Sequence, residues 1–472
     1  MSNTIKLIKV LYKKWAKEEP LEIKAIAESG SYRKYFRIRG KEKTAIGVYN
    51  KDKKENEAFI SFTKHFIEKG LNVPELYVQD LEKNIYLLQD LGDETLFSFA
   101  LKNKRPEVKK LYKAALEHLI RFQIDGGKEL DYSRCYPRNK FDRQSILWDL
   151  FYFKYYFIKL AKITFDEAKL EGDFNSLAHL LLKAGSNYFL YRDFQARNIV
   201  LHSNELYFVD YQGGRKGALQ YDVASLLFQA QINFSPVDRE ELLTYYIKML
   251  TKKINVKKKD YLKHYYNYVL IRLLQTFGAY GFRGFFENKT YFLKSIPFAL
   301  KNLEWLINEE LLPFNLKELH KVLIDITQNE VLKKFNVAEE KKMKVTVNSF
   351  SYKNGVPVDY SGNGGGFVFD CRVLNNPGRY SEYSNLTGKD TGVAQFLELK
   401  SNVNEFLDSI YILVDNAVKN YNERNFKNLM VNFGCTGGQH RSVYCAEKLA
   451  SHLNEKFEVK VELNHTQLKK KD

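Results

Sequence analysis

Residues 191–210 decide the fold: YRDFQARNIVL (191–201) is followed by the turn HSNE (202–205) and by LYFVD (206–210). Short apolar segments on both sides of a polar loop are typical of a strand, a loop and a tight hairpin. The loop carries Asp193 and Asn198, five residues apart, and the hairpin ends at Asp210. We therefore expect these three side chains to face one site.

Asp193, Asn198 and Asp210 are the residue types that phosphoryl transfer requires. A carboxylate orients the acceptor hydroxyl and takes its proton, while oxygen ligands hold Mg²⁺ on the β- and γ-phosphates of ATP. We assign Asp193 as the catalytic base, and Asn198 and Asp210 as the Mg²⁺ ligands. The alternative is a set of loop polar residues beside a buried hairpin, which leaves the third carboxylate at the hairpin's end unexplained.

Residues 1 to about 330 resemble the aminoglycoside phosphotransferase-like kinases, which are related in fold to the protein kinases. The resemblance extends to GSYRKYFR (30–37), LLQDLGD (87–93) and QYDVASLL (220–227), and it is nearest to the N-acetylmuramate/N-acetylglucosamine anomeric kinases. It implies ATP and Mg²⁺ as cofactors, a sugar or amino sugar as acceptor, and Asp222 as a structural support. Tyr191 stands where that family usually has His.

The same resemblance implies a nucleotide loop and an adenine hinge, formed by Ser29, Gly30, Ser31, Tyr32 and Arg33 and by Gln89, Asp90 and Leu91. One departure concerns the third strand, where protein kinases place a lysine that holds the α- and β-phosphates. The segment TAIGVY (44–49) contains none. Arg33 or Arg37 can serve instead, or the domain is a pseudokinase.

The segment FGCTGGQHRSVYCA (433–446) is a second candidate for phosphate binding. An apolar strand enters, two glycines turn the chain and a helix leaves, so that backbone N–H groups can surround an anion. Arg441 could add a bidentate contact. The candidate residues are Cys435, Thr436, Gly437, Gly438, Gln439, His440, Arg441 and Ser442.

Three functions compete for this glycine loop. The C-x5-R spacing of Cys435 and Arg441 matches cysteine-dependent phosphatases, although Gly434 replaces the His common before that Cys. Residues 344–472 resemble the C-terminal domain of the RNase adapter protein RapZ, on SFSYKNGVP (349–357), FVFDCR (367–372) and LTGKD (386–390). That resemblance implies an amino-sugar phosphate ligand and, in some members, a small RNA. Because no RNA-recognition signature accompanies it, we favour a phosphosugar ligand, leave RNA open and place phosphatase action third.

Composition indicates a globular protein of more than one domain. A chain of 472 residues exceeds one ordinary core, and 44% of it is hydrophobic. Four cysteines without a CxxC pair, no long apolar run and no evident signal peptide lead us to expect a cytoplasmic protein without a membrane span. The net charge of +17 fits anionic ligands or simply a lysine-rich surface.

We expect an α+β chain: a two-lobed protein-kinase-like fold, with a small β-rich lobe and a large helical lobe, followed by a separate small α/β domain. The expected boundaries are 1–335 for the kinase domain, 336–343 for a linker and 344–472 for the phosphosugar-binding domain. The combined prediction is a small-molecule kinase fused to a domain that binds a phosphorylated ligand. The main alternative is a non-catalytic RNA- or metabolite-binding adapter with a pseudokinase scaffold.

Overall fold

The computed structural model describes residues 3–26, 33–287, 289–313, 315–336, 342–359, 361, 365–424 and 426–468. Contacts divide the chain into two units, one formed by Met1–Arg283 and Lys294–Phe335, the other by Gly284–Leu293 and Asn336–Asp472. The expected nucleotide loop at Ser29–Tyr32 and most of the expected linker lie outside the described residues. Both therefore stay predictions.

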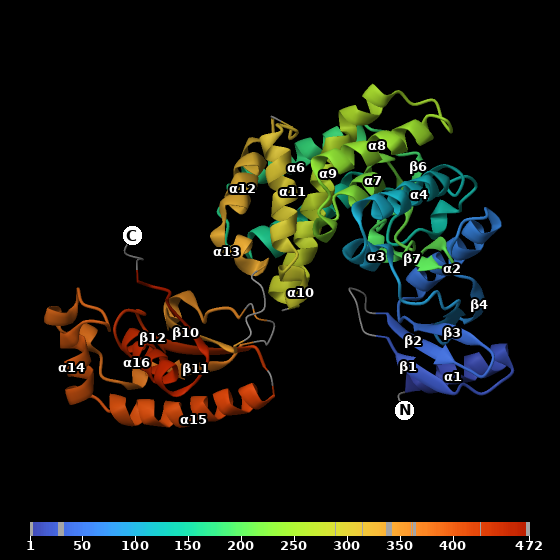
Figure 1. Ribbon diagram of the computed structural model, residues 1–472. Coiled ribbons are helices and arrows are strands. Elements are labelled where there is room, and N and C mark those ends of the chain that lie inside the picture. The colour runs from blue at the N-terminus through green and yellow to red at the C-terminus, as the bar shows by residue number, and fades with distance from the viewer. Residues whose placement is uncertain are drawn as a thin grey trace. The chain divides into compact units, whose positions relative to one another are not determined.

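The first unit begins with a small lobe built on an antiparallel sheet of order β1-β2-β3-β5-β4 (Figure 1). Its strands are β1 (Glu22–Ala25), β2 (Lys34–Arg39), β3 (Thr44–Tyr49), β4 (Leu76–Asp80) and β5 (Ile85–Leu88). A helix that the sequence analysis missed, α1 (Asn3–Ala16), packs Ile8, Leu11 and Tyr12 against one sheet face. On the other face lies α2 (Lys53–Glu68), with Phe59, Phe62 and Phe66 buried.

The start and end of α2 follow from its sequence. The carboxylate of Asp52 accepts a hydrogen bond from the backbone N–H of Glu55 at 3.2 Å, which satisfies one of the free donors of the first turn. After the helix, Gly70 has a φ of +66°, a conformation that glycine adopts without a steric penalty. These two signals fix the register of α2 and so the position of Glu55.

The helical lobe surrounds two short pairs of strands. Strand β6 (Tyr188–Leu190) pairs with β9 (Arg215–Gly217), and β7 (Ile199–His202) pairs with β8 (Glu205–Phe208). The helices are α3 (Leu96–Lys102), α4 (Arg105–Ile124), α5 (Arg143–Phe153), α6 (Glu167–Leu182), α7 (Gln220–Leu227), α8 (Pro236–Leu250), α9 (Lys258–Tyr280), α11 (Ile296–Asn308), α12 (Lys317–Gln328) and α13 (Glu330–Lys333). One hydrophobic core runs from the inner face of the small lobe into this lobe. Among the described helices, none combines the length and apolar character needed to cross a bilayer.

The second unit contains a parallel sheet of order β11-β12-β10-β13. Its elements are α10 (Thr290–Leu293), β10 (Lys344–Ser351), β11 (Phe367–Asp370), α14 (Thr391–Lys400), α15 (Val403–Glu423), β12 (Asn428–Cys435), α16 (Arg441–Lys456) and β13 (Lys460–His465). Strand β11 stops at Asp370 because the Asp370 carboxylate accepts from the N–H of Arg372 at 2.9 Å and turns the chain into a 3₁₀ helix. The chain is thus a two-lobed kinase-like fold with a separate α/β domain, as the sequence indicated.

Candidate functional site

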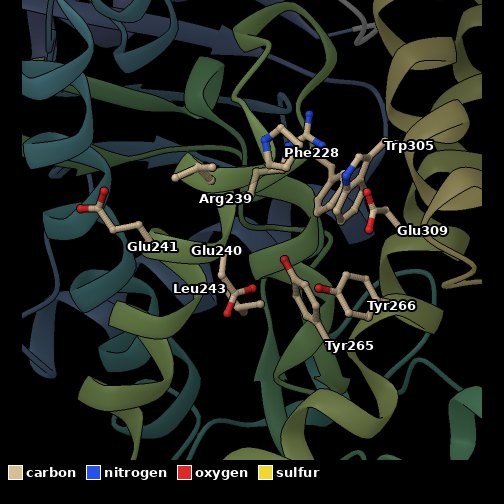
Figure 2. Close-up of a pocket in the computed structure, with 11 residues that line it drawn as sticks. Phe228, Arg239, Glu240, Glu241, Leu243, Tyr265, Tyr266, Trp305 and Glu309 are labelled. Carbon is tan, nitrogen blue, oxygen red and sulfur yellow. The ribbon is translucent and has the colours of Figure 1, made fainter.

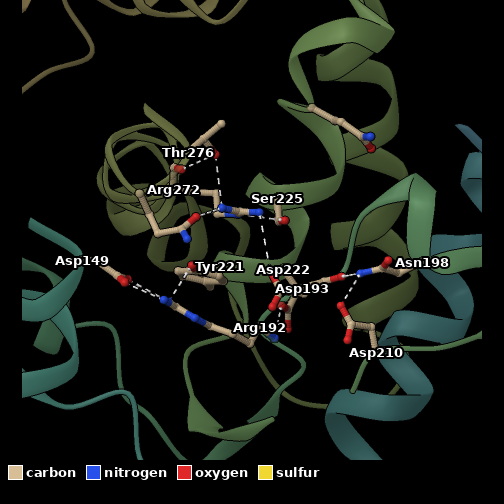
Figure 3. A network of polar contacts seen from close by, with 12 residues as sticks. Asp149, Arg192, Asp193, Asn198, Asp210, Tyr221, Asp222, Ser225, Arg272 and Thr276 are labelled. Atoms are coloured by element: carbon tan, nitrogen blue, oxygen red, sulfur yellow. Dashed lines mark hydrogen bonds and ion pairs between the residues drawn. The ribbon is translucent and has the colours of Figure 1, made fainter. Parts of the chain in front are cut away.

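Asp193, Asn198 and Asp210 come together at the loop between β6 and β7 (Figure 3). The amide nitrogen of Asn198 donates to the backbone carbonyl of Asp193 at 2.9 Å and to Oδ2 of Asp210 at 3.3 Å. The side chain of Asp193 is 41% exposed, so it is accessible from solvent. The three residues therefore form one connected group, with the amide oxygen of Asn198 not engaged by the described residues.

The electrostatics of Asp210 favour a bound cation. Burial raises the pKa of the Asp210 carboxyl, and the nearby charge of Asp193 raises it further, while Gln212 and Arg33 act against the rise. Gln212 donates to Oδ1 of Asp210 at 2.6 Å. Two protein oxygens from an amide and a carboxylate fit the way Mg²⁺ binds, because this ion completes its shell with water and phosphate oxygens. The donor set is thus suited to Mg²⁺ carried by a nucleotide.

Two residues in or beside this group have a positive backbone φ, which is uncommon for residues other than glycine. Arg192 has a φ of +83° and Asp210 a φ of +69°. Such residues cost about 1–3 kcal/mol each, and they persist where the surrounding structure holds them, often at functional sites. The strain therefore supports a functional role for this loop.

Asp222 on α7 holds the strained loop in place. Its carboxylate accepts from the backbone N–H groups of Tyr191 at 2.8 Å and Arg192 at 3.0 Å. Burial raises the pKa of Asp222 to about 7, and the two backbone donors act against that rise. Asp222 is thus placed as the structural support that the resemblance implied.

Tyr191 and Arg192 fasten the same loop to its surroundings. The hydroxyl of Tyr191, the residue that stands in the family's His position, donates to the carbonyl of Val209 at 2.7 Å, directly before Asp210. The guanidinium of Arg192 binds both carboxylate oxygens of Asp149, at 2.8 and 2.5 Å. Tyr191 therefore ties the catalytic loop to the hairpin that ends at Asp210.

Arg272 was not singled out in the sequence, yet it lies beside the expected base. Its guanidinium is 3.9 Å from Oδ1 of Asp193 and donates to the hydroxyl of Ser225 at 2.9 Å (Figure 3). Arg272 comes from α9, far from residues 191–210 in sequence. Only sequence information that links distant positions, such as covariation between them, could have identified it.

The expected hinge follows β5 and is tied to the small lobe by Arg37. Gln89 donates its N–H to the carbonyl of Glu75 at 2.9 Å. Arg37 binds Asp90 at 2.8 and 3.0 Å and Asp93 at 2.6 and 2.8 Å. The carbonyl of Leu91 lies 3.2 Å from Nδ1 of His202. The guanidinium of Arg37 is thus engaged by the carboxylates of the hinge region.

A cavity of about 480 Å³ lies on the helical lobe, apart from this group (Figure 2). The guanidinium of Arg239 lies over the ring of Phe228, 4.4 Å from its centroid. Tyr265, which also lines the cavity, is seven residues from Arg272 on α9, about 10 Å along the helix axis. The expected catalytic residues do not line this cavity, which is lined by Phe228, Pro236, Val237, Arg239, Glu240, Glu241, Leu243, Tyr265, Tyr266, Trp305 and Glu309.

In the second unit, the loop between β12 and α16 surrounds the Cys435 thiol. Cys435 is 3% exposed, and its sulfur lies 3.2 Å from both the N–H of Gly438 and the hydroxyl of Ser442. Burial acts to raise the pKa of this thiol, but the hydrogen bonds from Ser442 and Gly438 and the charge of Arg441 outweigh it, so the pKa lies below its usual value. The lowered pKa fits a reactive thiolate, whereas the 3% exposure restricts access to it, so the phosphatase alternative is left to experiment.

The other residues of this loop divide into anchored and exposed ones. Gln439 donates to the carbonyl of Leu386 at 2.8 Å, and His440 Nε2 lies 2.9 Å from the carbonyl of Tyr383. Gly438 has a φ of +68°, and a Cβ there would meet the nitrogen of Ser351 at 2.9 Å, so only glycine fits. Thr436 and Gly437 are exposed at the opening of the loop.

Arg441 has different partners from those expected. The residue is 5% exposed, and its NH1 donates to the backbone carbonyls of Arg372 at 3.2 Å and Leu374 at 2.9 Å. In the described structure, Arg441 therefore fastens the chain after β11 to the glycine loop. The sequence pattern alone could not distinguish this role from a phosphate contact. Across the described residues, no group of three or more His, Cys, Asp or Glu side chains could hold a metal ion.

We expect Asp222→Asn to lower the free energy of unfolding of the first unit by about 1–3 kcal/mol. An amide offers one acceptor oxygen, so its NH₂ group would face one of the two N–H donors that the carboxylate now satisfies. Denaturant unfolding of the variant measures this loss, with Asp260→Asn at an exposed position of α9 as control. Equal stability of the two variants would show that Asp222 does not support the loop.

Comparison with known proteins gives a match for each unit. Residues 22–253 match the family model of the phosphotransferase enzyme family, and residues 343–469 match that of the RapZ C-terminal domain. A nucleotide-binding protein of Fervidobacterium nodosum is 41% identical over 130 residues, which are 27% of this chain and 44% of the relative. One of Thermosipho africanus is 38% identical over 123 residues, 26% of this chain and 42% of the relative. The chain thus spans less than half the length of these relatives.

Solved structures of kinases resemble the chain at low sequence identity. A choline kinase from Cryptosporidium parvum has a TM-score of 0.46 and 16% identity, and the likeness covers 66% of this chain and 98% of that one. An ethanolamine kinase from Plasmodium vivax has a TM-score of 0.44 and 13% identity, with 60% of this chain and 81% of that one covered.

Proposed function

We propose that residues 1–335 are an ATP- and Mg²⁺-dependent kinase that phosphorylates a hydroxyl group of a small molecule. The resemblance to the anomeric kinases makes a sugar or amino sugar the proposed acceptor. The observation that carries this proposal is the hydrogen-bonded group of Asp193, Asn198 and Asp210 on a strained loop. The match of residues 22–253 to the phosphotransferase enzyme family supports the same reaction class.

In the proposed reaction, Asp193 accepts the proton of the acceptor hydroxyl. The hydroxyl oxygen forms a bond to the γ-phosphorus of ATP, and the bond from that phosphorus to the bridging oxygen of ADP breaks. Asn198 and Asp210 would hold Mg²⁺, which supplies positive charge against the phosphate oxygens when bound. The guanidinium of Arg272 lies 3.9 Å from Oδ1 of Asp193, and this ion pair would help to hold the carboxylate in place.

The acceptor is tested by following ATP consumption and ADP release against amino sugars, neutral sugars and simple amino alcohols. We expect turnover with at least one sugar or amino sugar, and the product is identified by mass. Turnover with amino alcohols alone would keep the kinase and remove the sugar assignment.

For the second unit we propose a binding site for a phosphorylated ligand, such as an amino-sugar phosphate, at the loop between β12 and α16. The supporting observation is that Thr436 and Gly437 are exposed in the loop that leads into α16. Backbone N–H groups and the helix dipole at such an N-terminus favour an anion. The match of residues 343–469 to the RapZ C-terminal domain supports a role in this unit separate from catalysis. RNA is a second ligand class to test, and it would be recognised by binding that weakens steeply as the salt concentration rises.

We expect Gly437→Ala to weaken binding of glucosamine 6-phosphate to the full chain by about ten- to a hundred-fold, the scale of losing one charge-assisted hydrogen bond. A Cβ at Gly437 meets no atom within 4 Å, so the substitution is tolerated by the fold and obstructs only a ligand in the loop. Titration calorimetry without nucleotide measures the affinity.

Cys435→Ser is the matched control, because a nucleophilic cysteine is required by a phosphatase and not by a binding site. We expect this variant to bind the phosphosugar almost as the unchanged protein does. Hydrolysis of a generic phosphate ester that disappears in Cys435→Ser would instead establish the phosphatase alternative.

A further inference from the structure

The third strand of the small lobe has no cation on its inner face. In an antiparallel pair, directly opposed residues point to the same side of the sheet, and Tyr35 on β2 opposes Val48 on β3. Val48 and Tyr35 belong to the core beneath the inner face, whereas Phe36 and Ile38 pack with α1 on the outer face. The inner face of β3 is therefore formed by the apolar side chains of Ile46 and Val48, with no cation between them.

Arg33 reaches the inner face from the neighbouring strand. It lies two residues before Tyr35, and side chains two apart on an extended chain share a face. Its side chain is 2% exposed, and its guanidinium lies 5.7 Å from the centroid of Phe59 on α2. Arg33 is thus a buried cation next to the position of Val48.

Glu55 on α2 pairs with Arg33 and is itself held on both sides. Arg33 NH2 lies 3.0 Å from Oε1 of Glu55, and Asn50 donates to Oε2 at 2.7 Å. In protein kinases the third-strand lysine is held by a glutamate of the corresponding helix. The carboxylate of that pair is therefore present here, and its cation comes from a different strand.

Other arginines of the second strand do not compete for this role. Arg37 shares the inner face, but Asp90 and Asp93 bind its guanidinium in the hinge region. Arg39 lies at the far end of β2 with 63% of its side chain exposed, 3.9 Å from Glu22. The charge of Arg33 also acts to lower the pKa of Asp210, so the two side chains influence each other.

We infer that Arg33, oriented by Glu55, binds the α- and β-phosphates of ATP in place of a third-strand lysine. This inference rests on the proposed kinase function. It assigns the phosphate-binding cation to the residue directly before β2, so that a positive charge is supplied although β3 has no lysine. The missing lysine of the third strand, which suggested a pseudokinase, is then no obstacle to catalysis.

The test compares the affinities of the full chain for Mg·ATP, Mg·ADP and adenosine by calorimetry. Arg33→Met keeps the aliphatic stem over Phe59 and removes the charge. We expect it to weaken ATP and ADP binding by about ten- to a hundred-fold and to leave adenosine binding unchanged, because adenosine has no phosphate. Arg39→Met, at an exposed position of β2, is the matched control, and we expect it to leave the ratio of ATP to adenosine affinity unchanged.

Two further variants keep the inference falsifiable. Glu55→Gln leaves Arg33 in place but removes the charge that orients it, and we expect it to reduce the affinity for ATP and not the affinity for adenosine. This variant tests the inference even where Arg33→Met does not fold. The double variant Arg33→Met/Val48→Lys returns a cation to the third strand and should restore part of the preference for ATP over adenosine. An unchanged ratio in both Arg33→Met and Glu55→Gln would overturn the inference. Failure of the unchanged protein to bind Mg·ATP would instead overturn the kinase proposal itself.

Discussion

Asp193→Asn is expected to reduce phosphate transfer by about 10²–10⁴-fold, the usual contribution of a general base. Asparagine keeps the size of the side chain but cannot accept the proton of the acceptor hydroxyl. The hydrogen bond from Asn198 goes to the backbone carbonyl of Asp193 and does not depend on its carboxylate. The loss should therefore appear in kcat, with the affinity for Mg·ATP and the melting temperature little changed.

Asp260→Asn on the same unit is the control for the removal of one exposed carboxylate. We expect this control to keep full activity with the acceptor found in the screen. A result against the kinase proposal would be a folded protein that binds Mg·ATP but transfers phosphate to no acceptor. The adapter with a pseudokinase scaffold would then be the better account.

The adapter alternative depends mainly on the missing third-strand lysine. The pairing of Arg33 with Glu55 weakens that argument, because it supplies a buried cation beside the strand that lacks the lysine. The hydrogen-bonded group of Asp193, Asn198 and Asp210 weakens it further, because a non-catalytic scaffold does not require a base and two candidate metal ligands in one group. Both observations favour an active phosphotransferase.

Local patterns were sufficient to predict the strand, loop and hairpin of residues 191–210, whose catalytic role stays a prediction. The segment 191–210 carries its strands, its turn and its polar residues within one short stretch, and the expected third strand at 44–49 coincides with β3. The separate α/β domain was predicted from the strand, glycine loop and helix of residues 433–446 and from the resemblance of residues 344–472. In these regions the sequence signal and the tertiary packing agree.

Long-range pairings could not be predicted from local patterns. Arg272 is brought to Asp193 by the packing of α9, and Glu55 is brought to Arg33 by the packing of α2 on the sheet. Arg441 matched a phosphatase spacing, but the chain after β11 supplies carbonyls that bind its guanidinium. Helix α1 is a different case, because Ile8, Leu11 and Trp15 recur at helical spacing, so the local signal was present and was overlooked.

The largest effect on nucleotide binding is expected from Asp210, and Asp210→Asn is the better variant than Asp210→Ala. Asp210 has a φ of +69°, which Asn tolerates more easily than Ala. Asparagine also retains an acceptor for Gln212, which now donates to Oδ1 of Asp210. The change removes the charge that would hold Mg²⁺ and, because only one acceptor oxygen is left, also the 3.3 Å hydrogen bond from Asn198.

For Asp210→Asn we expect the affinity for ATP to become independent of Mg²⁺, while adenosine binds as before. Because burial and Asp193 raise the pKa of Asp210 above its usual value, its ionised form destabilises the nucleotide-free protein, and this cost grows as the pH rises through the raised pKa. Replacing it by a neutral amide should leave stability near neutral pH unchanged or higher. Calorimetry with Mg²⁺ and with a chelator, together with thermal melting, measures both effects. An ATP affinity that still increases with Mg²⁺ in the variant would place the metal ligand elsewhere.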